Sequence, residues 1–321
     1  MDRRHAALCV LTALACGLLG ACSPSRSTGS PPAPPGGGYP VTVTAGDGQV
    51  GIPARPSRIL SLSASATQML YAIGAGPQVV AVDKYSTDPP QAPRTSMTGY
   101  EDSAESYLTV HPDLVILAFD TDGRLVAQLR VLHVPTLLLP PAVTLNDTYQ
   151  QMETLGTATG HLAAAKAAVA TVKARIAAIV AAVGNRARGR TYYQEIDNTL
   201  YTATSHTFIG ALYRLLGMVD IADAASKGSE YPQLSAEYLI NANPDYVFLA
   251  DTVCCGQNAA SFGARPGFGT MKAVTEGHVF ALNDALASEW GPRVADFLAT
   301  IAADVAPGSV TPAPSPLGGL P

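Results

Sequence analysis

The sequence predicts an α/β protein of two lobes with mainly parallel sheets, joined by one long helix. The first observation is an alanine-rich run, residues 161–183, which contains no Gly or Pro and is closed by Gly184. The second is an internal repeat that flanks this run, and the third is the alternation of strands and helices in both halves. Such alternation favours parallel sheets, because each helix returns the chain to the end where the next strand begins.

The alanine-rich run has one apolar stripe, with spacings of three, four and seven residues that are typical of one helix face. Alanine is the strongest intrinsic helix former, and at ~1.5 Å per residue the helix would be roughly 35 Å long. That length can cross a small domain, so we expect this helix to join the two halves. The stripe consists of Leu162, Val169, Val172, Ile176, Ile179 and Val183.

The repeat pairs residues 103–118, SAESYLTVHPDLVILA, with residues 235–250, SAEYLINANPDYVFLA. At a constant offset of 132 residues, Ser, Ala, Glu, Pro, Asp, Val, Leu and Ala fall in register. Each copy predicts a Ser N-cap, a Glu in the first helical turn, a short helix that ends before Pro and a buried strand. A repeat at this distance indicates two copies of one supersecondary unit.

The N-terminus has the pattern of a bacterial lipoprotein signal peptide, residues 1–21. Arg3 and Arg4 supply positive charge, residues 6–19 are apolar, and small residues lead to Cys22. A Cys at this place resembles a lipobox, which implies cleavage before Cys22 and lipid on its sulfur. The alternative is an ordinary signal peptide with a chance Cys.

Composition divides the remainder of the chain. Residues 22–40 and 306–321 are rich in Pro, Gly and Ser and favour a flexible tether and a disordered tail. Between them we predict an N-terminal lobe at 41–155, a bridging helix at 156–185 and a C-terminal lobe at 186–305.

The chain has 321 residues, 47% of them hydrophobic, which suffices for two modest cores. With a net charge of −5 and no basic patch, nucleic acid is excluded as a partner.

In the first half, Asp47-Gly48 indicates a hairpin, after which strands and helices alternate. The loop at 84–93 follows a buried strand, at the edge where open α/β sheets present ligand-contacting residues. The expected elements are a hairpin in 41–53, strand 58–62, helix 65–73, strand 79–82, the first repeat copy, helix 124–132, strand 135–139 and helix 145–155.

In the second half, Ser205 is the expected N-cap of a helix that Gly217 ends. A closing helix carries Pro292 in its first turn, where Pro is tolerated. The expected elements are strand 190–195, helix 205–216, the second repeat copy, a short helix within 267–276, strand 278–282 and helix 292–305.

Adjacent Cys254 and Cys255 are the other cysteines outside the signal peptide, in an oxidising compartment. A vicinal disulfide, two unpaired thiols or a partner contact are all compatible with the sequence. Enzyme motifs such as G-x-S-x-G, a phosphate loop or H-E-x-x-H are absent. The histidines are scattered, which disfavours a metal site built directly on them. We therefore expect neither an enzyme nor a cofactor.

Aromatic side chains suggest a binding function. A wall of Tyr and Phe with few charges suits a large, planar or partly apolar ligand. Several aromatic residues fall in loops or at element ends, outside the apolar stripes: Tyr85, Tyr100, Phe119, Tyr201 and Tyr231.

Glu105 and Glu237 occupy equivalent places in the two repeat copies. A Glu in the first turn merely favours the helix dipole, by ~0.3 to 1 kcal/mol. Its presence in both copies, where little else polar is shared, favours a docking role. One carboxylate on each lobe would pair with Arg residues of a two-fold related partner.

The chain resembles the ABC-transporter solute-binding proteins for ferric siderophores, haem and cobalamin, the class III periplasmic binding proteins. The resemblance covers residues 41–305 and rests on RILSLSASATQMLYAIGAG, YSTDPPQA, the two SAE…PD segments, TATSHTFIGALYRLLG and GPRVADFLATIA. It implies capture of an iron or cobalt chelate between the lobes and delivery to a dimeric permease. It also implies that Glu105 and Glu237 enter Arg-lined pockets of the permease subunits.

The resemblance also indicates ligand contacts. Tyr85 and Tyr231 match aromatic residues that contact the chelate in cobalamin binders, Tyr201 has a counterpart, and Trp290 lines the cleft from the second lobe. Positions near Gly99 and Ala118 lack the Trp that cobalamin binders tend to carry, which favours a ferric siderophore or haem. The side chains expected to offset an anionic ligand are Lys84, Arg94, Arg190 and Arg265.

The expected function is therefore a lipid-anchored extracytoplasmic protein that delivers a ferric chelate to an ABC importer. Cobalamin is the alternative ligand. The rival from another class is an envelope scaffold or sensor that kept the fold without transport.

Overall fold

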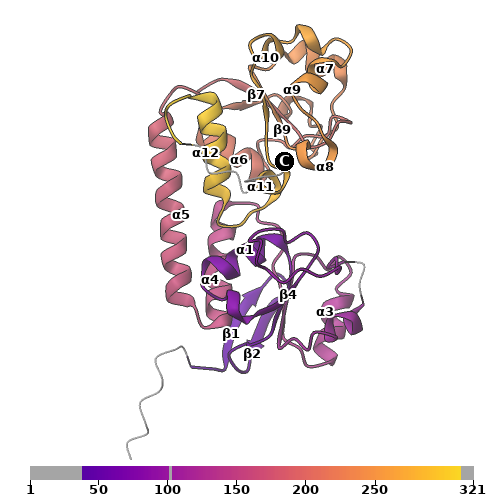
Figure 1. Cartoon of the computed structure of the whole chain (residues 1–321), viewed down its shortest axis with the longest axis vertical. Coiled ribbons are helices and arrows are strands. Elements are labelled where there is room, and N and C mark those ends of the chain that lie inside the picture. The colour runs from indigo at the N-terminus through magenta and orange to yellow at the C-terminus, as the bar shows by residue number, and fades with distance from the viewer. Residues whose placement is uncertain (1–37, 101–102, 312–321) are drawn as a thin grey trace, which may run out of the picture. The chain divides into compact units, whose positions relative to one another are not determined.

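The computed structural model describes residues 38–100 and 103–311, all of which belong to the compact unit Gly36–Pro321. Within this unit, two lobes lie beside one long helix (Figure 1). The predicted signal peptide, residues 1–21, and the predicted lipid site Cys22 lie outside the described residues. In the described ranges, no helix combines the length and the apolar character that a membrane span requires.

The N-terminal lobe is built on a four-stranded parallel sheet. Its elements are β1 (Val41–Ala45), β2 (Gly48–Ile52), β3 (Ile59–Leu62), α1 (Ala64–Ala72), η1 (Gly76–Gln78), β4 (Val79–Val82), α2 (Ala104–Leu108), β5 (Leu114–Leu117), α3 (Arg124–Val131) and β6 (Thr136–Leu138). The strand order is β4-β3-β5-β6, and β1 and β2 form a separate antiparallel hairpin. Every residue of β3 and β5 is buried, because parallel strands are covered on both faces.

The C-terminal lobe repeats this plan. Its elements are β7 (Thr191–Glu195), α6 (Phe208–Leu215), β8 (Val219–Asp220), η2 (Asp223–Ala225), α7 (Ala236–Ala242), β9 (Tyr246–Leu249), α8 (Thr252–Cys255), α9 (Ala259–Gly263), η3 (Phe268–Thr270), α10 (Lys272–Thr275), β10 (Val279–Ala281) and α11 (Asp284–Ser288). The order is β10-β9-β7-β8, again with parallel pairs. The central strand β9 is an apolar, fully buried run, whereas β7 is buried from its second residue onward although it ends in Gln194 and Glu195.

The predicted repeat is confirmed by the strands. β5 begins at Leu114 and β9 at Tyr246, the same offset of 132 residues that relates 103–118 to 235–250. β3 and β7, which begin at Ile59 and Thr191, keep this offset too. When these strands are matched, both sheets have the same order. Equivalent segments of the two copies therefore follow equivalent strands.

The helix α5 (Leu162–Val183) connects the lobes and packs against α4 (Leu145–Thr159) and α12 (Val294–Val305) (Figure 1). Gly156 allows the close approach of α4, since a Cβ there would lie 2.5 Å from the Cβ of Ala165. Most of the predicted stripe is buried. Leu162 is the exception at 38% exposure, and Ala165, at 0%, takes its place facing the core.

The hydrophobic core is partly shared by the lobes. The largest cluster includes Ile59 of β3, Phe248 of β9 and the buried face of α5. A second cluster lies in the N-terminal lobe and a third in the C-terminal lobe. The length of the chain had suggested two modest cores. The lobes share one because buried residues of α4, α5 and α12 belong to the same cluster as residues of both sheets.

Two helix starts differ from the prediction. α6 begins at Phe208, since Thr207 is its N-cap: the Thr207 hydroxyl accepts a hydrogen bond from the Gly210 N–H at 3.0 Å. Ser205 was wrong as the cap because it lies two residues before Thr207, whose side chain is the one next to the free amides of the first turn. The closing helix α12 begins at Val294, two residues later than expected.

Candidate functional site

A cavity of about 380 Å³ lies where loops of both lobes meet. Its N-terminal wall comes from segments that directly follow β3, β4 and β5. Carboxyl ends of parallel strands meet at one edge of a sheet, which is why these separate loops form one surface. Its C-terminal wall is residues 284–290, around α11. The lining consists of Leu62, Ser63, Ala64, Ser65, Asp83, Tyr85, Thr98, Tyr100, Ala118, Phe119, Asp284, Ala285, Ser288, Glu289 and Trp290.

Three loop aromatics from the N-terminal lobe come together here. Tyr85 and Tyr100 are stacked, with ring centroids 6.1 Å apart and 16° between the planes. Tyr85, Tyr100 and Phe119 are each about half exposed, at 46%, 53% and 48%. The ammonium of Lys84 lies 4.9 Å from the centre of the Tyr85 ring. Exposed rings beside a cavity provide apolar area that a ligand can cover.

Trp290 reaches the cavity from the C-terminal lobe and is held by the N-terminal lobe. Its backbone N–H donates to the Ser65 hydroxyl at 3.0 Å, and its indole N–H donates to Gln151 at 3.1 Å. Its carbonyl accepts from the Thr148 hydroxyl at 2.9 Å. Trp290 is the only Trp in the sequence, so intrinsic Trp fluorescence reports on this cavity alone.

The polar lining is acidic. Asp83, Asp284 and Glu289 contribute carboxyl groups, and no Lys, Arg or His is among the described residues that line the cavity. Burial raises the pKa of Asp83, partly offset by hydrogen bonds that its carboxylate accepts from Ser86 and from the Tyr85 amide. The described lining therefore offers carboxyl oxygens that can accept hydrogen bonds and no cationic side chain that would pair with an anion.

Glu289 links the lobes and is the most perturbed of the three. Burial, and then the charge of Asp88, raise the pKa of Glu289 to about 7, although the Arg293 guanidinium opposes the shift. The Gln68 side-chain amide on α1 donates a hydrogen bond to the Glu289 carboxyl. Asp88 and Arg293 form a second link between the lobes, with 3.4 Å between Arg293 Nη1 and Asp88 Oδ2. Near neutral pH, Glu289 is divided between its neutral and its charged form.

A larger cavity, of about 860 Å³, lies between the hairpin, α4 and the start of α5. Among the described residues, its lining includes no aromatic side chain and none that follows Lys166. The 380 Å³ cavity is the better candidate, because it combines aromatic walls, polar groups and residues of both lobes.

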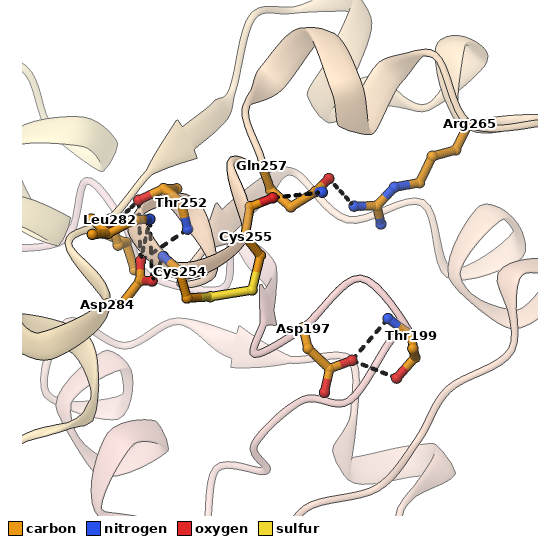
Figure 2. The surroundings of a disulfide bond; sticks show 10 residues. Asp197, Thr199, Thr252, Cys254, Cys255, Gln257, Arg265, Leu282 and Asp284 are labelled. Carbon is orange, nitrogen blue, oxygen red and sulfur yellow. Dashed lines mark hydrogen bonds between the residues drawn. A yellow bond between two sulfur atoms is a disulfide. The ribbon is translucent and has the colours of Figure 1, made fainter.

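Cys254 and Cys255 form a disulfide on α8, so the structure has the first of the three arrangements that the sequence left open. Figure 2 shows the disulfide next to Asp284, a residue of the cavity lining. The Asp284 carboxylate accepts hydrogen bonds from the backbone N–H groups of Thr252, Val253 and Cys254.

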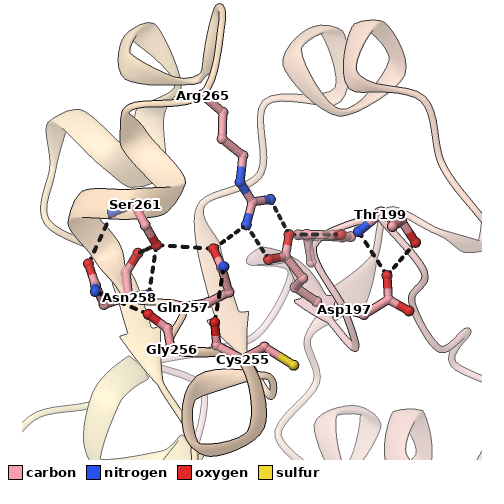
Figure 3. A network of polar contacts seen from close by, with 10 residues as sticks. Asp197, Thr199, Cys255, Gly256, Gln257, Asn258, Ser261 and Arg265 are labelled. Atoms are coloured by element: carbon pink, nitrogen blue, oxygen red, sulfur yellow. Dashed lines mark hydrogen bonds and ion pairs between the residues drawn. The ribbon is translucent and has the colours of Figure 1, made fainter.

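Behind this helix, Arg265 is committed to a buried ion pair (Figure 3). Its guanidinium donates to both carboxylate oxygens of Glu195 at 2.6 Å, and also to Gln257 at 2.9 Å. Glu195 is fully buried. Burial and then the Glu195 charge raise the pKa of the adjacent Asp251 to about 7. Arg265 thus compensates protein carboxyl groups in the C-terminal lobe.

The other predicted basic residues also lie outside the cavity lining. Arg190 faces Asp245 at 3.7 Å, Lys84 lies over Tyr85, and Arg94 forms a backbone bridge with Val82. None of the four predicted basic residues is among the described residues that line the cavity, although the Lys84 ammonium lies beside Tyr85, which does line it.

Tyr201 and Tyr231 lie on two neighbouring loop segments of the C-terminal lobe. Tyr201 forms a backbone bridge with Gln233, and the Thr202 N–H donates to the Pro232 carbonyl at 3.1 Å. Both tyrosines are exposed, at 42% and 49%. Neither is among the residues that line the 380 Å³ cavity, which include Tyr85, Tyr100, Phe119 and Trp290.

Glu105 and Glu237 are exposed in the first turns of α2 and α7. The predicted Ser N-caps are confirmed: the Ser103 hydroxyl accepts from the Ser106 N–H at 3.4 Å, and the Ser235 hydroxyl accepts from the Tyr238 N–H at 3.1 Å. Hydrogen bonds from its own backbone N–H and from Ser103 lower the pKa of Glu105. Both carboxylates are accessible on equivalent helices.

Sequence reasoning missed the acidic residues of the cavity. Asp83 directly follows a predicted buried strand, a position that could have identified it. Asp284 and Glu289 gave no such signal, since the sequence did not predict α11 and its contact with the other lobe.

The family model described as "Periplasmic binding protein" matches residues 59–286. A cobalamin-binding protein of Halobacterium salinarum is 31% identical over 273 residues, which cover 82% of this chain and 73% of that protein. An uncharacterized ABC transporter substrate-binding lipoprotein of Bacillus subtilis is 25% identical over 278 residues, covering 84% and 86%. The apo structure of a periplasmic haem-binding protein from Roseiflexus sp. RS-1 matches the fold, with a TM-score of 0.69, 24% identity and coverage of 79% and 99%.

Proposed function

The chain belongs to the periplasmic binding protein family, and from this premise we propose that it captures a cobalamin-type corrinoid and delivers it to an ABC importer. Proteins of this family are extracytoplasmic and bind solutes without catalysing a reaction. The ligand, the delivery step and the lipid anchor are the parts that we propose.

The acidic cavity carries the choice of ligand. A ferric catecholate is anionic and haem has two propionates, so either would meet Asp83, Asp284 and Glu289 with no basic side chain in the described lining. A corrinoid has a rim of amide groups, whose N–H bonds can be donated to carboxylates. Its conjugated macrocycle can pack on Tyr85, Tyr100 and Phe119. The 31% identity to a cobalamin-binding protein favours the same ligand over the ferric chelate expected from the sequence.

Calorimetric titration of the full-length chain with cyanocobalamin, haemin and an anionic ferric catecholate tests this proposal. We expect binding of cyanocobalamin, accompanied by a change in Trp290 emission because Trp290 lines the cavity. Binding of either anionic chelate but not of cyanocobalamin would contradict the proposal. Glu289→Gln removes one ionisable carboxyl from the cavity and should strengthen any binding of the anionic compounds.

For delivery, we propose that Glu105 and Glu237 dock on Arg residues of the two permease subunits. Their equivalent, exposed positions on α2 and α7 support this role. Replacing both by Ala should abolish corrinoid uptake by cells and leave the Kd for cyanocobalamin unchanged. Glu230→Ala, at another exposed glutamate, is the matched control. Normal uptake by the double variant would refute docking through these residues and favour another delivery surface.

For localisation, we propose a lipid anchor on Cys22 at the end of a short tether. The signal-like pattern that precedes this residue supports the anchor. Cys22→Ser should release the protein from the membrane fraction of producing cells. Retention of the variant in that fraction would contradict anchoring at this residue.

A further inference from the structure

The segment that follows β9 in the C-terminal lobe corresponds to the cavity-lining segment that follows β5 in the N-terminal lobe. β5 leads directly into Ala118 and Phe119, which line the cavity. β9 is related to β5 by the 132-residue repeat and leads directly into α8. In parallel sheets the loops after equivalent strands lie at the same edge, which is the ligand-binding edge in open α/β folds. α8 is therefore the C-terminal counterpart of the Phe119 segment.

α8 is also joined to the cavity by a shared residue. Asp284 lines the cavity and its carboxylate accepts the first backbone N–H groups of α8, including that of Cys254 at 2.7 Å (Figure 2). The Thr252 hydroxyl on the same helix donates to the Leu282 carbonyl, next to α11. α8 thus adjoins the C-terminal wall of the cavity through Asp284.

The exposed side chains of α8 are apolar, and two of them are joined to each other. Val253 is 60% exposed, and Cys254 and Cys255 are exposed as well. The disulfide removes both thiol groups and joins the two side chains into one small ring. Behind the ring, Gln257 accepts from Arg265 and its backbone N–H donates to the Asp251 carbonyl at 3.3 Å (Figure 3). Fixed side chains lose little conformational entropy when a ligand covers them.

We propose that Val253 and the Cys254–Cys255 disulfide contact the part of the bound corrinoid that extends beyond the cavity. This inference rests on the proposed function. A cavity of about 380 Å³ is at the lower end of pockets that enclose drug-sized molecules, and a corrinoid is much larger than those. The part outside the cavity must cover adjacent surface. Polarizable sulfur and a branched apolar side chain suit contact with the edge of a macrocycle.

Binding of cyanocobalamin to full-length variants tests the contact. Cys254→Ser combined with Cys255→Ser removes the ring, and Val253→Ser removes the neighbouring apolar group without touching the disulfide. We expect each to raise the Kd about tenfold, which corresponds to about 1.4 kcal/mol. Val131→Ser is the matched control, because Val131 is 77% exposed on α3 and absent from the cavity lining. Thermal unfolding of each variant shows whether it is folded.

A protection measurement gives a readout that a purely structural disulfide would not change. Dithiothreitol reduces the disulfide by two electrons and two protons, and becomes a cyclic disulfide itself. Bound cyanocobalamin should slow the appearance of thiols in the peptide that contains Cys254 and Cys255, as followed by alkylation and mass spectrometry. Unchanged Kd values together with no protection would overturn this inference alone, since the unaltered chain would still bind. No binding by the unaltered chain would overturn the proposed function and this inference with it.

Discussion

Replacing Glu289 with Gln should make the protein more stable at alkaline pH and leave its stability nearly unchanged at acidic pH. The pKa of Glu289 is raised from 4.5 to about 7 in the folded protein, chiefly by burial. A carboxyl group with a raised pKa binds its proton more tightly in the folded state than in the unfolded state. Its stabilising contribution is present below about pH 4.5 and is lost as the pH rises through about 7.

The magnitude follows from the size of the shift. The difference between 4.5 and about 7 corresponds to at most about 3.4 kcal/mol at ~1.36 kcal/mol per pKa unit. Solvent screening of this partly exposed group reduces the expected effect to about 1–2 kcal/mol. Gln at this position keeps an oxygen that accepts from the Gln68 amide but cannot ionise, so the variant does not lose stability with pH through this group.

Urea unfolding at about pH 5 and at about pH 8 measures this difference by linear extrapolation. The variant is compared with the unaltered chain at each pH, because Asp220, Asp251 and Asp304 also have pKa values raised to about 7 and affect both proteins alike. Glu230→Gln, at an exposed site, is the control for loss of one negative charge. If the stability difference between Glu289→Gln and the unaltered chain does not grow with pH, the pKa of Glu289 is not raised in the folded protein as described above.

Two further changes probe the C-terminal lobe. Arg265→Met should lower the free energy of unfolding in urea by about 3–5 kcal/mol, because it leaves the fully buried Glu195 without its partner. Arg265→Lys should restore only part of that loss. A Met variant as stable as the unaltered chain would contradict this account of the ion pair. Gly210→Ala should lower the melting temperature, with an overpacking cost of about 1–3 kcal/mol, since its Cβ would lie 2.2 Å from the Thr204 carbonyl oxygen. Gly51→Ala has nothing within 4 Å of its Cβ and should behave as the unaltered chain does; equal melting temperatures for both variants would refute the steric argument.

The fold was accessible from the sequence because its signals are local or repeated. Helix α5 follows from alanine content and the period of its apolar stripe, and Gly184 ends it as expected. The repeat at an offset of 132 residues predicted the helix and strand of each copy, including the N-caps Ser103 and Ser235. Loops gave weaker signals, which is why α8, α9 and α11 were not predicted.

The sequence by itself determined the two-lobed α/β plan, since helix period, buried strand runs and an internal repeat depend only on neighbouring residues. It also indicated which aromatic side chains lie in loops. Only the tertiary structure decided that Asp83, Asp284 and Glu289 share one cavity and that Arg190 and Arg265 pair with carboxylates elsewhere. Charges far apart in the chain act on one ligand only after two lobes pack together. The electrostatic potential inside the cavity therefore depends on how the lobes pack, and a local sequence pattern does not predict it.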